Sequence, residues 1–256
     1  MKSVEKKLLI AKIEDKIEFC ITKNKIVYTD FLNMSEKSIV QEYLIKNKKG
    51  NYVFYGVKEN ADRNILIIYP EKLNEEYLEE SYSKILELIR IRLPKDIKYE
   101  HKDYLSGIMK LGIKREKFGD IIVNEYGADI VVLKEISEYM LSNLNDLKRF
   151  KKSEIQIVNI SEITNIETVY EDIKIIVSSM RLDNLVSELA RCSRTKSTEI
   201  IEQSRVFVNS INEFKLSKKI DINDIITIRG KGKFVIDSIE KETKGGKIVL
   251  NVKKYM

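Results

Sequence analysis

The order of apolar patterns between residues 84 and 160 constrains the fold of this chain more than any other feature. Segments with strand-like and helix-like spacing follow one another in the order strand, helix, strand, strand, helix, strand. In sequence order they are ILELIRIRLP, YLSGIMKLGI, FGDIIVNE, ADIVVLK, EISEYMLSNLNDL and SEIQIVNI. The first could also be a helix that runs into a strand. This order predicts a ferredoxin-like or RRM-like plait, a fold shared by many unrelated proteins, so it does not indicate a function.

The segments on either side predict two further small units. Before residue 73, apolar residues at helical spacing predict two helices, and the runs NYVFYGV and NILIIYP predict a hairpin. After residue 180, RLDNLVSELAR has apolar residues at i, i+3, i+4 and i+7, which predicts a helix with one buried stripe. A second helix, RTKSTEIIEQ, and four short strand-like runs follow it. The predicted fold class is therefore α+β, with domains over residues 1–72, 73–172 and 180–256.

Composition excludes several classes of protein. The chain has 256 residues, of which 43% are hydrophobic, enough to build packed cores. No apolar run reaches the length of a membrane span, and the first residues lack the apolar stretch of a signal peptide. Two distant cysteines favour ordinary buried thiols over a disulfide. We expect a soluble cytoplasmic protein without a membrane contact, most simply a monomer.

The excess positive charge lies at the C-terminal end of the sequence. From Arg181 onward there are 16 Lys and Arg against 10 Asp and Glu, a net +6. The preceding 180 residues hold the remaining 30 basic and 30 acidic residues, so their net charge is zero. Such a segment would attract a polyanion, and the release of counterions from phosphate would supply affinity. A solvated lysine-rich surface would give the same count, so charge alone leaves both interpretations open.

The junction ARCSRTKS between the two C-terminal helices gives a sharper signal. Ser193 is well placed to cap the second helix, whose first turn then carries Arg194 and Lys196. Cations at a helix start oppose the helix dipole, unless an anion such as phosphate binds there. Arg181 and Arg191 can project towards the same side. A second basic edge is expected at Arg229, Lys231 and Lys233, which are interleaved with glycines that let a ligand approach the backbone.

The same residues carry a resemblance to a known RNA-binding motif. The segment RLDNLVSELARCSRTKSTEIIEQSRVFVNS resembles the αL RNA-binding motif, the domain named for the fourth small-subunit ribosomal protein. It keeps the R-L-D, S-R-T and V-F-V-N elements of that motif. Ser204 and Ser210 stand where the motif usually has glycine. The resemblance implies that residues 180–256 bind structured RNA through Ser193, Arg194, Thr195 and Lys196.

A second resemblance covers residues 101–123. The segment HKDYLSGIMKLGIKREKFGDIIV is similar to the signature of the YlmH family of bacterial proteins, with Ser106 in place of a glycine. This resemblance implies a non-enzymatic factor of ribosome-associated quality control. Its partners would be the ribosome, the rRNA of the large subunit and, as an open alternative, peptidyl-tRNA. His101, Lys114, Arg115 and Lys117 would form a second RNA-facing patch, with a solvated loop as the competing interpretation.

No catalytic or metal-binding pattern accompanies these motifs. Arg181-Leu182-Asp183 also resembles the catalytic tripeptide of pseudouridine synthases, but here it continues into an amphipathic helix, which favours a structural role for Asp183. One histidine and two dispersed cysteines do not make an ordinary zinc site, and no glycine-rich cofactor turn occurs. No cofactor, metal or catalytic residue is expected. The rival functions are an RNA-modifying enzyme and a cell-division interaction protein.

Overall fold

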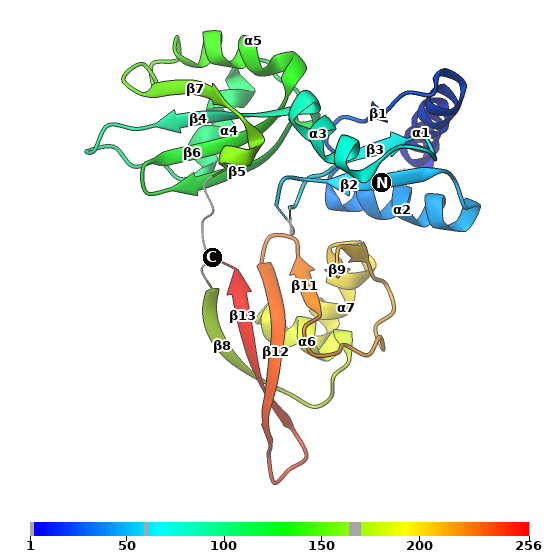
Figure 1. The fold of residues 1–256 in the computed structure, drawn as a ribbon. Helices are drawn as coiled ribbons and strands as arrows, with labels where there is room; N and C mark the ends of the chain where they lie inside the picture. The colour runs from blue at the N-terminus through cyan, green and yellow to red at the C-terminus, as the bar shows by residue number, and fades with distance from the viewer. Residues whose placement is uncertain (1–2, 59–60, 164–169, 256) are drawn as a thin grey trace. The chain divides into compact units, whose positions relative to one another are not determined.

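The computed structural model of the chain describes residues 3–58, 61–163 and 170–255. It divides into two compact units, Met1–Asn165 and Ile166–Met256, each with its own packed core (Figure 1). Both units combine helices with antiparallel sheets, so the predicted α+β class is confirmed.

The N-terminal part of the first unit contains the two predicted helices and the predicted hairpin. A short strand that was not predicted, β1, joins them in a sheet of order β1-β3-β2. The elements are α1 (Ser3–Lys23), β1 (Val27–Tyr28), α2 (Met34–Asn47), β2 (Asn51–Tyr55) and β3 (Ile65–Tyr69). Asn33 and Glu36 form a capping box that fixes the start of α2. Apolar residues of α1, α2 and β3 form a common core.

The predicted plait forms the rest of the first unit, with its strands in the order β5-β6-β4-β7 and all neighbours antiparallel. Its elements are α3 (Glu75–Ile85), β4 (Leu86–Arg92), α4 (His101–Lys110), η1 (Arg115–Lys117), β5 (Phe118–Asn124), β6 (Gly127–Leu133), α5 (Lys134–Leu144), β7 (Glu154–Val158) and η2 (Ile160–Glu162). The expected order of strands and helices is confirmed. The run ILELIRIRLP is the end of a helix that continues into a strand, because α3 ends at Ile85 and β4 begins at Leu86.

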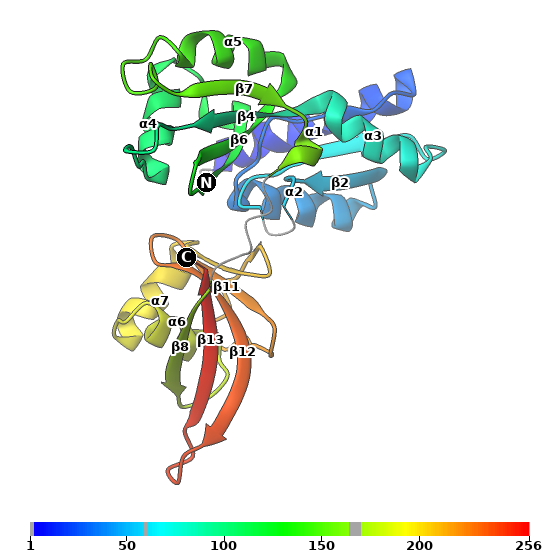
Figure 2. The same ribbon diagram turned by 60° about the vertical axis from the view of Figure 1, so that its left-hand side comes forward.

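Both faces of the plait sheet are covered by protein. All seven residues of β6 are buried, and successive residues of a strand point to opposite faces. Helices α4 and α5 cover one face (Figure 2). On β5, a Cβ added at Gly119 would lie 2.6 Å from the Phe31 ring, so the N-terminal part of the unit packs closely against this sheet. The central strand therefore has no open face on which RNA bases could stack, as they do in classical RRMs.

The second unit packs two helices against one face of a sheet of order β10-β9-β11-β12-β13-β8 (Figure 1). Its elements are β8 (Tyr170–Val177), α6 (Leu182–Leu189), α7 (Arg194–Glu202), β9 (Val206–Val208), β10 (Ile211–Asn212), β11 (Ile225–Ile228), β12 (Gly232–Glu242) and β13 (Ile248–Tyr255). The apolar stripe of α6 is buried in this core, as predicted. The ends of β12 and β13 extend as a hairpin beyond the helices.

The unit begins earlier than the boundaries expected from the sequence. Strand β8 pairs with β13 from Tyr170 to Val177, so the expected domain end at residue 172 lies inside a strand of the C-terminal sheet. The domain start expected at residue 180 would leave that strand out. The added residues 166–180 contain three acidic groups and one basic group. The second unit accordingly carries +4, with 17 basic and 13 acidic residues, and the first carries +2, with 29 and 27.

Candidate nucleic-acid interface

The turn between α6 and α7 presents its basic residues on a fixed backbone. Helix α6 ends at Leu189, and Arg191 takes a left-handed conformation with φ 51°. The N–H of Arg191 donates to the Glu188 carbonyl (3.1 Å) and that of Cys192 to the Ser187 carbonyl (2.9 Å). This is the pattern of a Schellman motif, in which glycine is the usual left-handed residue. The backbone of Arg191 is therefore strained, because the left-handed conformation is unfavourable for a residue with a Cβ. Its cationic side chain is exposed at the turn.

Ser193 caps α7, as the sequence predicts. Its extended backbone places Oγ to accept the N–H of Lys196 at 3.2 Å. Arg194, Thr195 and Lys196 follow in the first turn and are exposed, and that turn contains no acidic residue. The start of α7 therefore combines the positive end of the helix dipole with two cationic side chains. The two cations are unfavourable at the start of the isolated helix, but together with the backbone N–H groups there they would favour binding of an anion.

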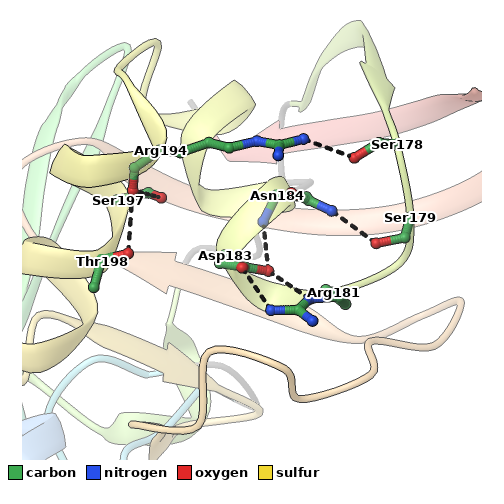
Figure 3. A network of polar contacts seen from close by, with 8 residues as sticks. All are labelled: Ser178, Ser179, Arg181, Asp183, Asn184, Arg194, Ser197 and Thr198. Atoms are coloured by element: carbon green, nitrogen blue, oxygen red, sulfur yellow. Dashed lines mark hydrogen bonds and ion pairs between the residues drawn. The ribbon is translucent and has the colours of Figure 1, made fainter.

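Arg181, the residue just before α6, and Arg194 of α7 lie along the same turn between β8 and α6 (Figure 3). Arg194 Nη2 donates to Ser178 Oγ at 3.0 Å. Arg181 donates to both carboxylate oxygens of Asp183, from Nε at 3.1 Å and Nη2 at 2.8 Å. Asn184 Nδ2 donates to Ser179 Oγ at 2.7 Å. The structure thus places Arg181 of the R-L-D element and Arg194 of the S-R-T element beside the same turn. Arg191 and Lys196 are their neighbours along the chain at the junction of α6 and α7, and we call these four cations the α6–α7 edge: Arg181, Arg191, Arg194 and Lys196.

Asp183 has a structural partner within this network. The hydrogen bond from Arg181 is the main cause that lowers the pKa of Asp183, and the Asn184 N–H also donates to it at 3.1 Å. The carboxylate is therefore held ionised between a guanidinium and a backbone donor at the start of α6. This is the role expected of a first-turn acid.

Two cations of the α6–α7 edge form ion pairs at the surface. Besides the Arg181–Asp183 pair, Lys196 Nζ lies 2.6 Å from Glu199 on the next turn. The side chains of both lysine and glutamate are about half exposed. Ion pairs at such surfaces contribute between zero and about 1 kcal/mol, because water competes for both groups. A phosphate could replace Glu199 as the partner of Lys196 at little cost, whereas Arg181 is held by two hydrogen bonds to Asp183.

The second basic edge does not join the first. Arg205, just beyond the end of α7, forms two hydrogen bonds with the turn between β11 and β12. The Arg229 N–H donates to the Arg205 carbonyl at 2.9 Å, and Arg205 Nη2 donates to the Arg229 carbonyl at 2.8 Å. The turn thus adjoins the C-terminal end of α7, about 13 Å along the helix from Arg194. Arg229 and Lys233 lie over the rings of Phe207 and Tyr255, whereas Lys231 is exposed at the turn itself.

In the first unit, two of the four predicted contact residues are engaged in internal contacts. Lys117 Nζ lies 2.9 Å from Asp30 and 2.7 Å from Glu135. Burial opposes the charge of Lys117, but these two carboxylates outweigh it and raise its pKa to about 12. Arg115 donates to the carbonyls of Phe118 (2.6 Å) and Gly119 (3.0 Å) and stacks over the Phe118 ring. Burial, and then the charge of Arg63, lower its pKa to about 10.

The other two predicted residues of that patch remain at the surface. His101 is the first residue of α4, and Lys114 precedes η1; both are exposed. Desolvation, followed by the charge of Arg115, lowers the pKa of His101, so the imidazole is neutral at pH 7. A neutral imidazole adds hydrogen-bonding capacity but no charge to any contact with a polyanion.

Much of the signature-like segment instead joins the N-terminal part to the plait. Asp120 accepts the N–H groups of Asp62 (3.0 Å) and Arg63 (3.2 Å), which lie in the β2–β3 hairpin loop. Within the plait, a Cβ at Gly107 would lie 2.6 Å from the Phe150 ring. Sequence reasoning missed these roles, because each depends on a partner more than 40 residues away.

The part of the chain that the structure describes shows no grouping of three or more His, Cys, Asp or Glu side chains suited to a metal ion. Across the same residues, no helix has both the length and the apolar character required to span a membrane.

Comparisons with known proteins agree with these features. Residues 67–165 match a family model described as "Putative RNA-binding domain in YlmH", a range that covers the whole plait. Over 221 residues the chain is 29% identical to the ribosome-associated protein quality control protein P2 of Bacillus subtilis (strain 168), spanning 86% of this chain and 83% of that protein. A solved structure, the cell division protein ylmH from Streptococcus pneumoniae, aligns with 64% of this chain and 98% of its own, with a TM-score of 0.50 and 18% identity. The chain is therefore similar to the YlmH family over its plait and to a ribosome-associated quality-control protein over most of its length. The likeness to the solved structure shows the fold alone.

Proposed function

We propose that this protein is a non-enzymatic, ribosome-associated RNA-binding factor that acts in quality control of stalled translation. The observation that carries the proposal is the α6–α7 edge, where Arg194 of α7 donates to Ser178 in the β8–α6 turn that ends at Arg181. The match to a domain described as RNA-binding and the likeness to a ribosome-associated quality-control protein support it. A cytoplasmic location follows from this function.

We further propose that the ligand is ribosomal RNA. The α6–α7 edge binds the sugar-phosphate backbone of rRNA in the large ribosomal subunit, and Ser193 and Thr195 at the start of α7 offer hydroxyl groups to the same phosphates. Lys231 and its neighbours at the β11–β12 turn contact a separate stretch of RNA. His101 and Lys114 give the first unit a smaller contact, whereas Arg115 and Lys117 mainly support its fold. Contact with peptidyl-tRNA would extend the same phosphate chemistry.

The proposal excludes a nucleophilic role for Asp183. A pseudouridine synthase would need this carboxylate to be directed at a base, but here both of its oxygens accept hydrogen bonds from Arg181. Mass mapping of nucleosides in rRNA incubated with the purified protein tests the point. We expect no modified nucleoside, and a new modification that disappears with Asp183→Asn would overturn the non-enzymatic assignment.

Sedimentation of cell lysate through sucrose gradients tests the proposed function. At low salt the protein should migrate with free large ribosomal subunits, and it should leave them as salt rises, because phosphate contacts weaken with ionic strength. The double substitution Arg194→Ala, Lys196→Ala should release the protein at lower salt and reduce the salt dependence of binding by about two units of slope.

A matched control removes the same charge elsewhere in the second unit. Lys244 and Lys247 lie exposed at the tip of the β12–β13 hairpin, so Lys244→Ala, Lys247→Ala should sediment like the wild-type protein. Equal losses in the two variants would mean that only net charge matters and would remove the α6–α7 edge from the proposal.

A second candidate function is an interaction role in cell division. The structural relative from Streptococcus pneumoniae is named a cell division protein, although a likeness at 18% identity shows the fold alone. If the protein stayed at the top of the gradient under every condition and septal proteins dominated its pull-downs, this candidate would replace the ribosomal one.

A further inference from the structure

The loop between β10 and β11 lies against the start of α6 and is fixed there by backbone hydrogen bonds. We define the 213–219 loop as Glu213–Lys219. The N–H of Leu182 donates to the Lys218 carbonyl (2.9 Å) and that of Asp183 to the Leu216 carbonyl (3.1 Å). A β-bridge also joins Lys219 to Arg181. The loop therefore continues the α6–α7 edge, and its carbonyls occupy the N–H groups at the start of α6.

The loop presents an exposed aromatic ring on a defined backbone. Phe214 is 54% exposed. The Glu213 carboxylate accepts the N–H groups of Phe214 (3.0 Å) and Lys215 (2.9 Å), and the Glu213 N–H donates to the Val206 carbonyl (3.1 Å). These bonds fix the position from which the ring projects. A single exposed apolar side chain is common on protein surfaces, so the surroundings of the ring decide whether it suits a ligand.

The charges around Phe214 decide which class of partner fits. The loop contains Lys215, Lys218 and Lys219, all exposed, against the single acid Glu213. The centres of protein–protein interfaces are depleted in lysine, whereas proteins that bind single-stranded nucleic acid combine exposed aromatic rings with a positively charged path for the backbone. The adjoining α6–α7 edge continues that positive path. Charge complementarity therefore favours RNA over a protein partner.

We propose that Phe214 stacks on an unpaired base of the bound RNA, while the lysines of the 213–219 loop contact the phosphates on either side of that base. The inference rests on the proposed RNA-binding function and deepens it. A continuous A-form duplex keeps its bases stacked inside, so the preferred ligand is a helix that ends in a loop or contains a bulge. The α6–α7 edge holds the backbone, and the 213–219 loop distinguishes paired from unpaired RNA.

Binding of two RNA probes by the full-length protein tests this proposal. One probe is a stem-loop with an unpaired loop, and the other is a fully paired duplex with the same number of phosphates. Phe214→Ala should weaken binding to the stem-loop about tenfold, leave the duplex unaffected and keep the salt slope, because stacking on an aromatic ring involves no charge. Phe214→Tyr retains a ring and should bind both probes like the wild-type protein.

A lysine variant and its control complete the test. The triple variant Lys215→Ala, Lys218→Ala, Lys219→Ala should lower affinity and the salt slope. Lys241→Ala, Lys244→Ala, Lys247→Ala, at the end of β12 and in the turn that follows it, should change neither. Thermal unfolding of each variant establishes that it is folded.

The outcomes separate this inference from the proposed function. If Arg194→Ala, Lys196→Ala weakens binding but Phe214→Ala leaves the stem-loop affinity unchanged, the function stands and the stacking role is wrong. If Phe214→Ala removes the protein from ribosomes without changing RNA affinity, Phe214 docks on a protein and the RNA assignment is wrong. If the wild-type protein binds neither probe nor ribosomes, both proposals fail.

Discussion

At the residue scale, the second unit places side chains where glycine would carry less strain. Arg191, Ser204 and Ser210 have φ values of 51°, 59° and 67°. Ser204 ends α7 in the same way that Arg191 ends α6, with its N–H donating to the Ile201 carbonyl and that of Arg205 to the Ile200 carbonyl. The motif that this segment resembles has glycine at the two serine positions. The two serines thus have the same left-handed backbone geometry as glycine would, and their Cβ atoms make that geometry less stable.

Replacing these serines by glycine should stabilise the second unit. A left-handed conformation of a non-glycine residue costs the folded state roughly 1–2 kcal/mol. Glycine removes this strain, but it also stabilises the unfolded chain by about 0.4–1 kcal/mol because glycine has more conformational freedom there. We expect Ser204→Gly and Ser210→Gly each to raise the free energy of unfolding by about 0.5–1 kcal/mol, measured by urea titration. Ser217→Gly, at a residue without positive φ, is the matched control and should lower it. Loss of stability in both Ser204→Gly and Ser210→Gly would show that the hydroxyls have partners of their own.

Replacing Arg191 by glycine should change stability and RNA binding in opposite directions. Arg191→Gly relieves the same strain and should raise the free energy of unfolding by about 0.5–1 kcal/mol. If Arg191 contacts a phosphate, the variant should also bind RNA more weakly, with a salt slope lower by about one unit. Arg191→Lys keeps the charge and should retain most of the binding. A glycine variant with wild-type affinity and slope would exclude Arg191 from the interface.

At the element scale, the contact between the β2–β3 hairpin loop and β5 joins the N-terminal part of the first unit to the plait. Asp120 accepts two backbone N–H groups of that hairpin, while Lys117, just before β5, bridges Asp30 and Glu135. Burial, and then the nearby charge of Asp62, raise the pKa of Asp120 to about 6. The hairpin is therefore attached through a carboxylate whose charge the protein environment disfavours.

This attachment should make stability depend on pH between about 4 and 6. The pKa of Asp120 is about 6 in the folded protein and about 3.9 in an unfolded chain. The folded state binds more protons in this window, so the contribution of Asp120 to stability is largest below pH 4 and is lost as pH rises towards 6. We expect the wild-type protein to gain stability relative to Asp120→Asn on going from pH 7 to 4.5 in urea titrations. A difference between the two proteins that stays constant with pH would contradict the raised pKa.

At the scale of the whole molecule, β8 makes the second unit complete. It covers the edge of β13 and adds Ile175 and Val177 to the core. Without it, β13 would expose a long unpaired edge, a template for association with other chains. The extent of the unit is thus set by the pairing of its first and last strands.

Two fragments should differ sharply in folding. Residues 166–256 contain the full sheet and should unfold cooperatively, whereas residues 180–256, the domain predicted from the sequence, should be unfolded or aggregated. Circular dichroism and sedimentation velocity distinguish these states. If the longer fragment binds the stem-loop RNA with the salt slope of the full-length protein, the second unit contains the main phosphate contacts. Cooperative folding of the shorter fragment as a monomer would show that β8 is dispensable.

Features that depend on neighbours along the chain could be predicted from the amino-acid sequence. The buried stripe of α6, the Ser193 cap of α7 and the hairpin of β2 and β3 follow from spacings of a few residues, and the structure confirms them. The order of strands and helices was also sufficient to predict the plait. The assignment of RNA contacts to the basic residues of the α6–α7 edge rests on local motifs too, and it stays a prediction.

Which groups are available for binding depends instead on contacts in the folded protein. Lys117 resembles any solvated lysine in the sequence, but its partner Asp30 lies 87 residues away. The membership of β8 in the C-terminal sheet, the burial of both faces of β6 and the position of the 213–219 loop beside Arg181 likewise depend on contacts between distant segments. Local spacing carries no information about such contacts, because they form only when the chain closes long loops around a shared core.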